Sequence, residues 1–97
     1  MSSISEAAYT KTVKRFLKAL PKTWFFKVWG GGMQKRGIPD ILGVINGRFF
    51  ALELKASDGS PTELQKRNIK LILAAGGYAK ISYPEDWEIT RKELSKL

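Results

Sequence analysis

The sequence predicts one α/β domain in which a mixed sheet is flanked by helices, with its elements in the order α-β-β-β-α-β. Three observations carry this prediction. Residues 5–20 have helical periodicity, an Asn-Gly pair separates two apolar runs in the middle of the chain, and a capped helical segment follows them. A chain of 97 residues has room for one modest core, so residues 1–97 are expected to form a single domain.

The first third of the chain predicts a helix, a strand and a loop. Within residues 5–20 the apolar residues recur at helical spacing, at Val13, Phe16, Leu17 and Leu20. Pro21 is expected to end this helix. The aromatic and β-branched run Trp24–Trp29 then predicts a strand. The stretch Gly30–Gly37 is rich in glycine and basic residues and is expected to form a flexible loop.

The middle of the chain predicts a β-hairpin. Two apolar runs, Pro39–Ile45 and Arg48–Lys55, are separated by Asn46-Gly47. This pair favours a tight hairpin turn because both turn residues must adopt positive φ. With a two-residue turn, Ile45 pairs with Arg48, and the residue numbers of every further pair sum to 93.

A second helix and a fourth strand are expected after the hairpin. Ser60 would cap the helix, with Pro61 in the first position and Glu63 in the third. The helix is expected to reach about Ala75 and to stop at Gly76-Gly77. Its expected buried residues are Leu64, Leu71 and Ile72. Residues 78–82 predict a strand, and the short segment from residue 84 onward is expected to be partly helical.

The missing residue types exclude several chemistries. The chain contains no His and no Cys, so structural zinc sites, thiol nucleophiles and histidine general bases are excluded. Any catalysis has to use carboxylates, lysines, hydroxyls and a hard cation with oxygen ligands. No run approaches the roughly 18 apolar residues of a membrane span, and no signal peptide is recognisable at the N-terminus. We therefore expect a cytoplasmic protein without a membrane partner.

The charge balance favours a polyanionic partner. Lys and Arg number 17 against 9 acidic residues, which gives a net charge of +8. The excess is strongest in residues 1–38, where Glu6 is the single acid. Such a balance is typical of nucleic-acid binding, although a charged face can also serve solubility alone.

The hairpin register brings two acidic residues together. Asp40 would face Glu53 directly, as a non-hydrogen-bonded pair with Cα atoms roughly 4.5 Å apart. Two carboxylates held this close repel each other unless a cation cancels their charge, and Mg²⁺ or Mn²⁺ prefers such oxygen ligands. Lys55 lies two residues beyond Glu53 and therefore points from the same face of the strand. Leu54 points to the opposite face, into the core.

These residues resemble a nuclease signature. Pro39-Asp40, a gap of twelve residues and then Glu53-Leu54-Lys55 are similar to the motif of PD-(D/E)XK nucleases. The wider context includes Gly37-Ile38 before the Pro-Asp pair, Gln65 in the next helix and Gly76-Gly77 after it. This context resembles the virus-type replication-repair nuclease (VRR-NUC) family over roughly residues 6–83. The resemblance implies a restriction-endonuclease-like core, with the same order of elements that periodicity predicts.

The resemblance implies a role for each motif residue. Asp40, Glu53 and the main-chain carbonyl of Leu54 would hold Mg²⁺ or Mn²⁺ and so activate water against a phosphodiester. Lys55 would orient that water or neutralise charge on the phosphate. Taken singly, Asp40 could be a turn-flanking acid, and the other side chains could belong to an exposed polar strand face.

Two further residues are candidates for the same site. Glu6 begins the helical stripe that continues through Val13 and Leu20, and the resemblance places a glutamate of the first helix at the metal; the alternative is an ordinary acid near a helix N-terminus. Gln65 matches a glutamine that lies near the catalytic residues in the family, or is a solvated helix residue.

Basic residues supply candidate phosphate contacts. Lys35 and Arg36 lie just before the Pro-Asp pair in the glycine-rich loop, and the first helix carries Lys11 and Lys14 together with Arg15 and Lys18. The sequence does not decide whether the helix residues bind phosphates or are only solvated. Phosphate contacts carry no direct base information.

The leading hypothesis is a DNA endonuclease that uses Mg²⁺ or Mn²⁺. The resemblance implies branched substrates such as Holliday junctions, a homodimer, a function in DNA repair and a bacterial or phage-infected cell. The alternatives are a less selective DNA nuclease and a basic DNA-binding module in which the carboxylates are inert.

Overall fold

The computed structural model describes residues 4–29 and 36–97 and confirms an α/β fold with a mixed sheet flanked by helices. The first helix, α1 (Glu6–Ala19), begins after Ser5, whose hydroxyl accepts a hydrogen bond from the Ala8 N–H at 3.1 Å. Its inward face buries Tyr9, Val13 and Leu17, which lie four residues apart.

The sheet has four strands in the order β1-β2-β3-β4, with bounds β1 Thr23–Lys27, β2 Ile41–Ile45, β3 Arg48–Leu54 and β4 Tyr78–Ser82. Strand β2 is antiparallel to both β1 and β3, whereas β4 runs parallel to β3. The predicted hairpin is confirmed, because Ile45 pairs with Arg48 across Asn46 (φ 50°) and Gly47 (φ 81°). Each strand lies within two residues of its expected bounds.

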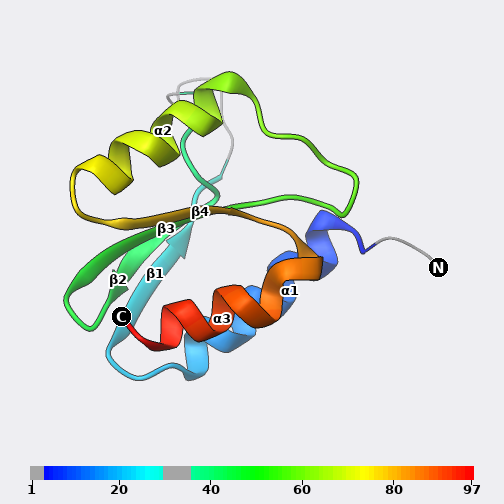
Figure 1. Ribbon diagram of the computed structural model, residues 1–97. Helices are drawn as coiled ribbons and strands as arrows, with labels where there is room; N and C mark the ends of the chain where they lie inside the picture. The colour runs from blue at the N-terminus through cyan, green and yellow to red at the C-terminus, as the bar shows by residue number, and fades with distance from the viewer. Residues whose placement is uncertain (1–3, 30–35) are drawn as a thin grey trace.

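The helices cover the two faces of the sheet unequally (Figure 1). Helix α2 (Glu63–Ala74) makes the crossover between β3 and β4 and lies alone on one face, whereas α1 and α3 (Trp87–Ser95) share the other. The main core lies between the sheet and these two helices and includes Phe50 and Leu54. A smaller cluster lies between α2 and the sheet and consists of Ile69 from the helix and Ala51 and Ala79 from the strands.

Helix α2 differs from its expected form at two points. Its N-cap is Thr62, not Ser60, so Pro61 and Glu63 are not its first and third residues. The reason is a reciprocal capping box, in which the Thr62 hydroxyl accepts from the Gln65 N–H at 3.1 Å and the Gln65 side chain accepts from the Thr62 N–H at 2.8 Å.

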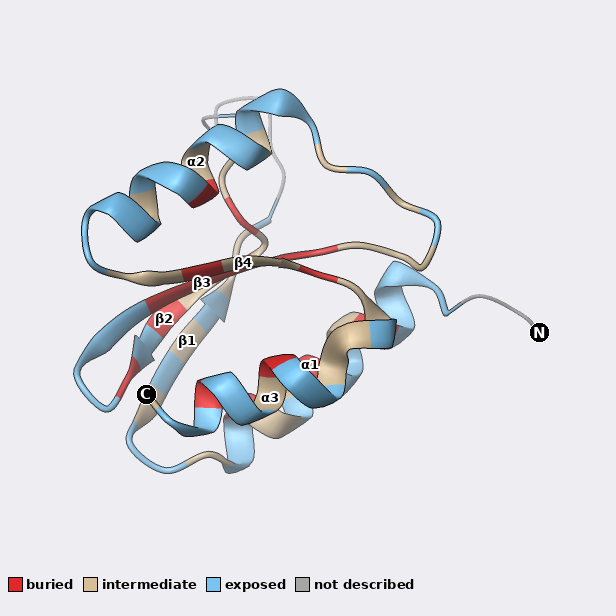
Figure 2. Cartoon of the chain, viewed as in Figure 1, coloured by how far each residue is buried: buried red, intermediate tan, exposed pale blue. Residues whose placement is uncertain are grey.

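The buried face of α2 was predicted correctly only at Ile72. Leu64 and Leu71 are 47% and 53% exposed, whereas Ile69 is buried and Ile72 partly buried. The reason is that α2 packs mainly on the parallel pair β3 and β4, which buries only a narrow stripe of the helix. Figure 2 shows this stripe against the exposed outer surface of α2.

The segment from residue 84 onward, which was expected to be partly helical, is helical over most of its length. A single 3₁₀ turn, η1 (Pro84–Asp86), leads into α3, which buries Thr90 and Leu94. None of the helices in the described ranges is long and apolar enough to cross a membrane.

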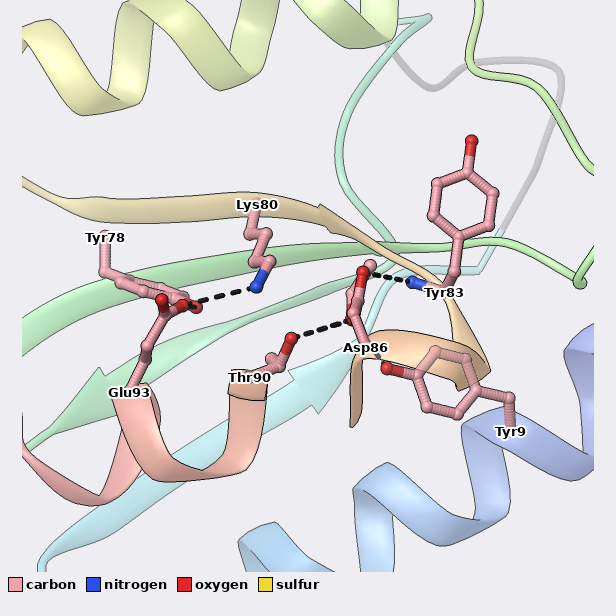
Figure 3. Close-up of polar contacts among 8 residues, drawn as sticks. Tyr9, Tyr78, Lys80, Tyr83, Asp86, Thr90 and Glu93 are labelled. Atoms are coloured by element: carbon pink, nitrogen blue, oxygen red, sulfur yellow. Dashed lines mark hydrogen bonds and ion pairs between the residues drawn. The ribbon is translucent and has the colours of Figure 1, made fainter. Parts of the chain in front are cut away.

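A hydroxyl cluster centred on Asp86 fastens α1, β4 and α3 together (Figure 3). The Tyr9 hydroxyl lies 2.6 Å from that of Ser82, which donates to Asp86 Oδ1 at 2.7 Å. Thr90 Oγ1 donates to the same oxygen at 3.0 Å, and Asp86 Oδ2 accepts from the Tyr83 N–H at 3.2 Å. We call these residues the Asp86 cluster. Both carboxylate oxygens are thus engaged by donors within the fold.

Candidate metal centre

The hairpin register places Asp40 beside Glu53. The pairs from Ile45–Arg48 to Ile41–Leu52 all sum to 93, as predicted, and Asp40 and Glu53 are the next residues along the two chains. Their neighbours Leu42 and Ala51 face α2, so both carboxylates lie on the α2 side of the sheet. Asp40 Oδ2 accepts a hydrogen bond from the Leu54 N–H at 2.9 Å, which ties the end of one strand to the other.

Gly37 and Asn68 hold the segment before Asp40 against α2. Gly37 has a φ of +80°, and a Cβ there would lie 2.8 Å from the Leu64 Cβ. Its carbonyl accepts from the Asn68 side-chain amide at 2.9 Å. Helix α2 and the segment before Asp40 can approach this closely only because residue 37 has no side chain.

Glu53 is buried and only partly hydrogen-bonded. Its side chain is 3% exposed. Its Oε2 atom accepts from Lys55 Nζ at 3.2 Å and from the Gln65 amide at 3.1 Å. Its Oε1 atom is buried without any hydrogen-bond partner among the described residues. A buried carboxylate oxygen in this state costs free energy unless a further donor or a cation approaches it.

The electrostatic environment opposes the charged form of Glu53. The pKa of this carboxyl is raised to about 7, first by burial and then by the negative charge of Asp40. Lys55 acts in the opposite direction, through its hydrogen bond and its charge. The two carboxylates therefore repel each other across the hairpin, and one ammonium group only partly offsets this repulsion.

Gln65, the glutamine of the resemblance, contacts Glu53. The capping box uses its Oε1 atom to accept from Thr62, so its NH₂ group must point in the other direction. There it donates to Glu53 Oε2. The N-terminal turn of α2 thus fixes the orientation of the amide that holds Glu53.

Lys27 was missed by the sequence prediction. Its ammonium group lies 3.7 Å from Asp40 Oδ1 and 5.6 Å from the centroid of the Trp29 ring. The side chains of Lys27 and Asp40 are only 19% and 22% exposed. The β1–β2 register could have revealed this contact, because Lys27 pairs with Ile41, next to Asp40; the sequence alone does not contain that register.

The structure does not bring Glu6 to the pair of carboxylates. Glu6 is exposed in the first turn of α1. The described residues contain no group of three or more acidic side chains that could hold one metal ion. Of the expected metal ligands, the structure brings together Asp40 and Glu53, and the Leu54 N–H contacts Asp40.

The candidate phosphate contacts lie in different regions. Lys35 lies outside the described residues. Arg36 is exposed and lines a shallow hollow of ≈ 260 Å³ against α2, together with Arg67. The basic residues of α1 line a second open hollow of ≈ 320 Å³, formed by Lys11, Lys14, Arg15 and Lys18.

Comparison with known proteins gives no family assignment. The chain matches no protein-family model and no curated protein. The VRR-NUC resemblance therefore stays a prediction from the motif residues quoted above.

Proposed function

We propose that this chain is a metal-dependent DNA endonuclease of the PD-(D/E)XK type that hydrolyses phosphodiester bonds. The observation that carries the proposal is the buried carboxylate of Glu53, which lies across the hairpin from Asp40 and has one oxygen without a hydrogen-bond partner among the described residues. Mg²⁺ or Mn²⁺ would bind this oxygen, and its positive charge would offset the repulsion between the two carboxylates.

The residues present fit such a cation. Asp40 and Glu53 would hold it, together with the main-chain carbonyl of Leu54. When bound, the cation supplies positive charge that polarises the scissile phosphate and makes a water molecule more acidic. Gln65 keeps Glu53 Oε2 occupied, which leaves Oε1 as the oxygen available to a ligand.

Lys55 supplies the second cationic group of the mechanism. Its ammonium lies 3.2 Å from Glu53 and its side chain is only 12% exposed, so its position is well constrained. From there it would neutralise charge that develops on the phosphate oxygens, or orient the attacking water. A lysine is suited to both tasks because it has three donors and no acceptor.

The charge of the surface supports DNA as the substrate. The chain has a net charge of +8, and four basic residues of α1 line one hollow. A polyanion that approaches this surface gains favourable electrostatic energy over a long range. The preference for branched DNA rests on the family resemblance, and the substrate panel below tests it separately.

A panel of DNA substrates tests the proposal. The purified chain is incubated with a four-way junction, a flap, single-stranded DNA and linear duplex, each with Mg²⁺, Mn²⁺ or a chelator. We expect cleavage with either metal ion and none with the chelator. Faster cleavage of the junction and the flap than of the duplex would support structure selectivity, and equal rates would favour a less selective nuclease.

Substitutions with a matched control test whether Asp40 and Glu53 are required for DNA cleavage. Asp40→Ala and Glu53→Ala should abolish cleavage while DNA binding, measured by fluorescence anisotropy, is retained. Glu88→Gln is the control, because it removes an exposed carboxylate of α3 and should leave both properties unchanged. If the unmutated chain binds DNA but cuts none of the substrates with Mn²⁺, the chain is a basic DNA-binding module.

A further inference from the structure

Strand β1 forms an edge of the sheet, and its outer side has no strand partner within residues 4–29 and 36–97. The Val28 N–H donates to the Asp40 carbonyl at 2.7 Å, and the Asn46 N–H donates to the Lys22 carbonyl at 2.8 Å. Because bonding alternates along an antiparallel strand, the even-numbered residues of β1 pair with β2 and the odd-numbered residues point outward. Within the described part of the chain, no strand lies on that outer side.

The same strand exposes two large aromatic side chains. Trp24 is 64% exposed and Phe26 is 45% exposed, and their rings lie 5.6 Å apart. Both lie on the α2 side of the sheet, because Phe25 between them packs into the main core. Natural edge strands are usually protected by charges, prolines or bulges, and within β1 only Lys27 supplies such protection. An aromatic pair on an open edge indicates a surface that another chain covers.

The edge is complementary to itself. If two copies of β1 pair antiparallel about Phe25, each Trp24 lies directly opposite Phe26 of the other copy, on the same face. The outward N–H and carbonyl groups of Thr23, Phe25 and Lys27 then all find partners. Thr23 lies opposite Lys27, so no like charges face each other. Cross-strand aromatic pairs of this kind stabilise antiparallel sheets.

We propose that the β1 edge joins two copies of this chain, with Trp24 of each copy packed against Phe26 of the other. The two four-stranded sheets become one continuous sheet about a two-fold axis. Such an axis is perpendicular to the sheet, so both copies of the Asp40–Glu53 pair open on the same face of the dimer. The proposal goes beyond the nuclease function and does not depend on it, because it rests only on the edge geometry.

Disulfide trapping tests the predicted register directly. The chain has no cysteine, so introduced thiols have no background. Residues 24 and 26 of opposite copies form a non-hydrogen-bonded pair with Cα atoms about 4.5 Å apart, within the range of a disulfide. An oxidised mixture of Trp24→Cys and Phe26→Cys proteins should therefore give a crosslinked dimer on non-reducing gels.

Neither cysteine variant should crosslink efficiently alone. In this register residue 24 of one copy lies diagonally from residue 24 of the other, about 7–8 Å away or more. Equal crosslinking of each variant alone would overturn the register. The absence of any crosslink in the mixture, with a monomeric wild type, would overturn the interface.

Molar mass in solution tests the interface without cysteines. We expect light scattering to give a dimer of the 10.9 kDa chain at micromolar concentrations. Trp24→Lys should weaken dimerisation at least tenfold. Ile89→Lys is the matched control, because Ile89 is 59% exposed but lies on α3, away from the β1 edge.

A backbone variant separates interface loss from unfolding. Thr23→Pro removes an N–H that points outward, so β1–β2 pairing should survive while dimerisation is lost. Circular dichroism checks the fold of each variant. A wild-type chain that stays monomeric at hundreds of micromolar overturns the proposal. So does a monomer in which single-stranded DNA quenches the Trp24 fluorescence, because the aromatic pair would then bind nucleobases instead of a second copy.

Discussion

The two faces of the sheet each carry a buried polar cluster, and the two clusters differ in how completely their polar groups are satisfied. In the Asp86 cluster, each carboxylate oxygen accepts from a donor within the fold. In the candidate metal centre, Glu53 Oε1 has no such donor in the described structure, and the facing Asp40 adds a like charge. The first arrangement is complete as folded, whereas the second leaves one buried carboxylate oxygen without a donor among the described residues.

Under the proposed function, this difference separates residues that hold the fold from residues that carry chemistry. A satisfied polar network contributes stability, so its loss should appear in unfolding measurements. A pair of carboxylates that repel each other costs stability, and such pairs are found more often at functional sites. Substitutions in the two clusters should therefore give opposite patterns of stability and activity.

The largest effect is expected from Glu53→Gln. This change keeps the shape of the side chain and removes a cation ligand, so we expect a loss of DNA cleavage of about 10³-fold. Stability should stay equal or rise, because the substitution removes the repulsion from Asp40. Cleavage rates with Mn²⁺ and urea denaturation check the two halves of the prediction. A marked fall in stability with cleavage unchanged would show that Glu53 is a structural residue.

The reverse pattern is expected from Asp86→Ala. The change leaves the Ser82 and Thr90 hydroxyls and the Tyr83 N–H without their acceptor, so we expect a loss of about 3 kcal/mol in the free energy of unfolding. Mn²⁺ affinity, measured by calorimetry on the folded protein, should stay within twofold. Asp86→Asn retains one acceptor oxygen and should lose less stability. A stability change below about 0.5 kcal/mol for Asp86→Ala would contradict the comparison.

Much of the geometry of the candidate metal centre could be predicted from sequence because it depends on local structure. The Asn46-Gly47 turn fixes the β2–β3 register, and the register fixes which residues face each other. Lys55 follows from Glu53 by strand alternation alone, and its contact with Glu53 confirms that both share a face.

The parts that sequence missed depend on contacts between distant elements. The contact of Lys27 with Asp40 needs the β1–β2 register, which no short turn specifies. The exposed leucines of α2 lie outside the narrow stripe of the helix that packs on β3 and β4. The sequence prediction placed the N-cap of α2 at Ser60, whereas the structure has it at Thr62. Two overlapping patterns, Ser-Pro-Thr-Glu and Thr-x-x-Gln, both resemble a helix start, and only the second forms the capping box.

The Asp86 cluster should also respond to alkaline pH. Burial raises the pKa of Tyr9 to about 12, from an ordinary value of 10.0. The pKa of Tyr9 is therefore higher in the folded than in the unfolded chain. The contribution of Tyr9 to the free energy of unfolding is complete below pH 10 and is lost as the pH rises from 10 to 12. The loss from Tyr9 should reach up to about 2.5 kcal/mol. Urea denaturation across this range measures the loss.

Tyr9→Phe provides the control for this pH dependence. It removes the ionising group, so the decline between pH 10 and 12 should become shallower. Some decline should remain, because burial also raises the pKa of Tyr78. An unchanged slope in Tyr9→Phe would show that Tyr9 does not ionise in this window.

The smallest effects are expected at the N-terminus of α2. There Gln65 both caps the helix and donates a hydrogen bond to Glu53 of the candidate metal centre. Gln65→Ala removes half of the capping box and the donor to Glu53, whereas Thr62→Ala removes only the other half of the box. Each should lower the free energy of unfolding by about 1 kcal/mol. Only Gln65→Ala should weaken Mn²⁺ binding, by about tenfold, because Glu53 loses the amide that orients it. Calorimetric titration of both variants checks this. Equal weakening in Thr62→Ala would mean that the position of the helix end, rather than the amide, keeps Glu53 in place.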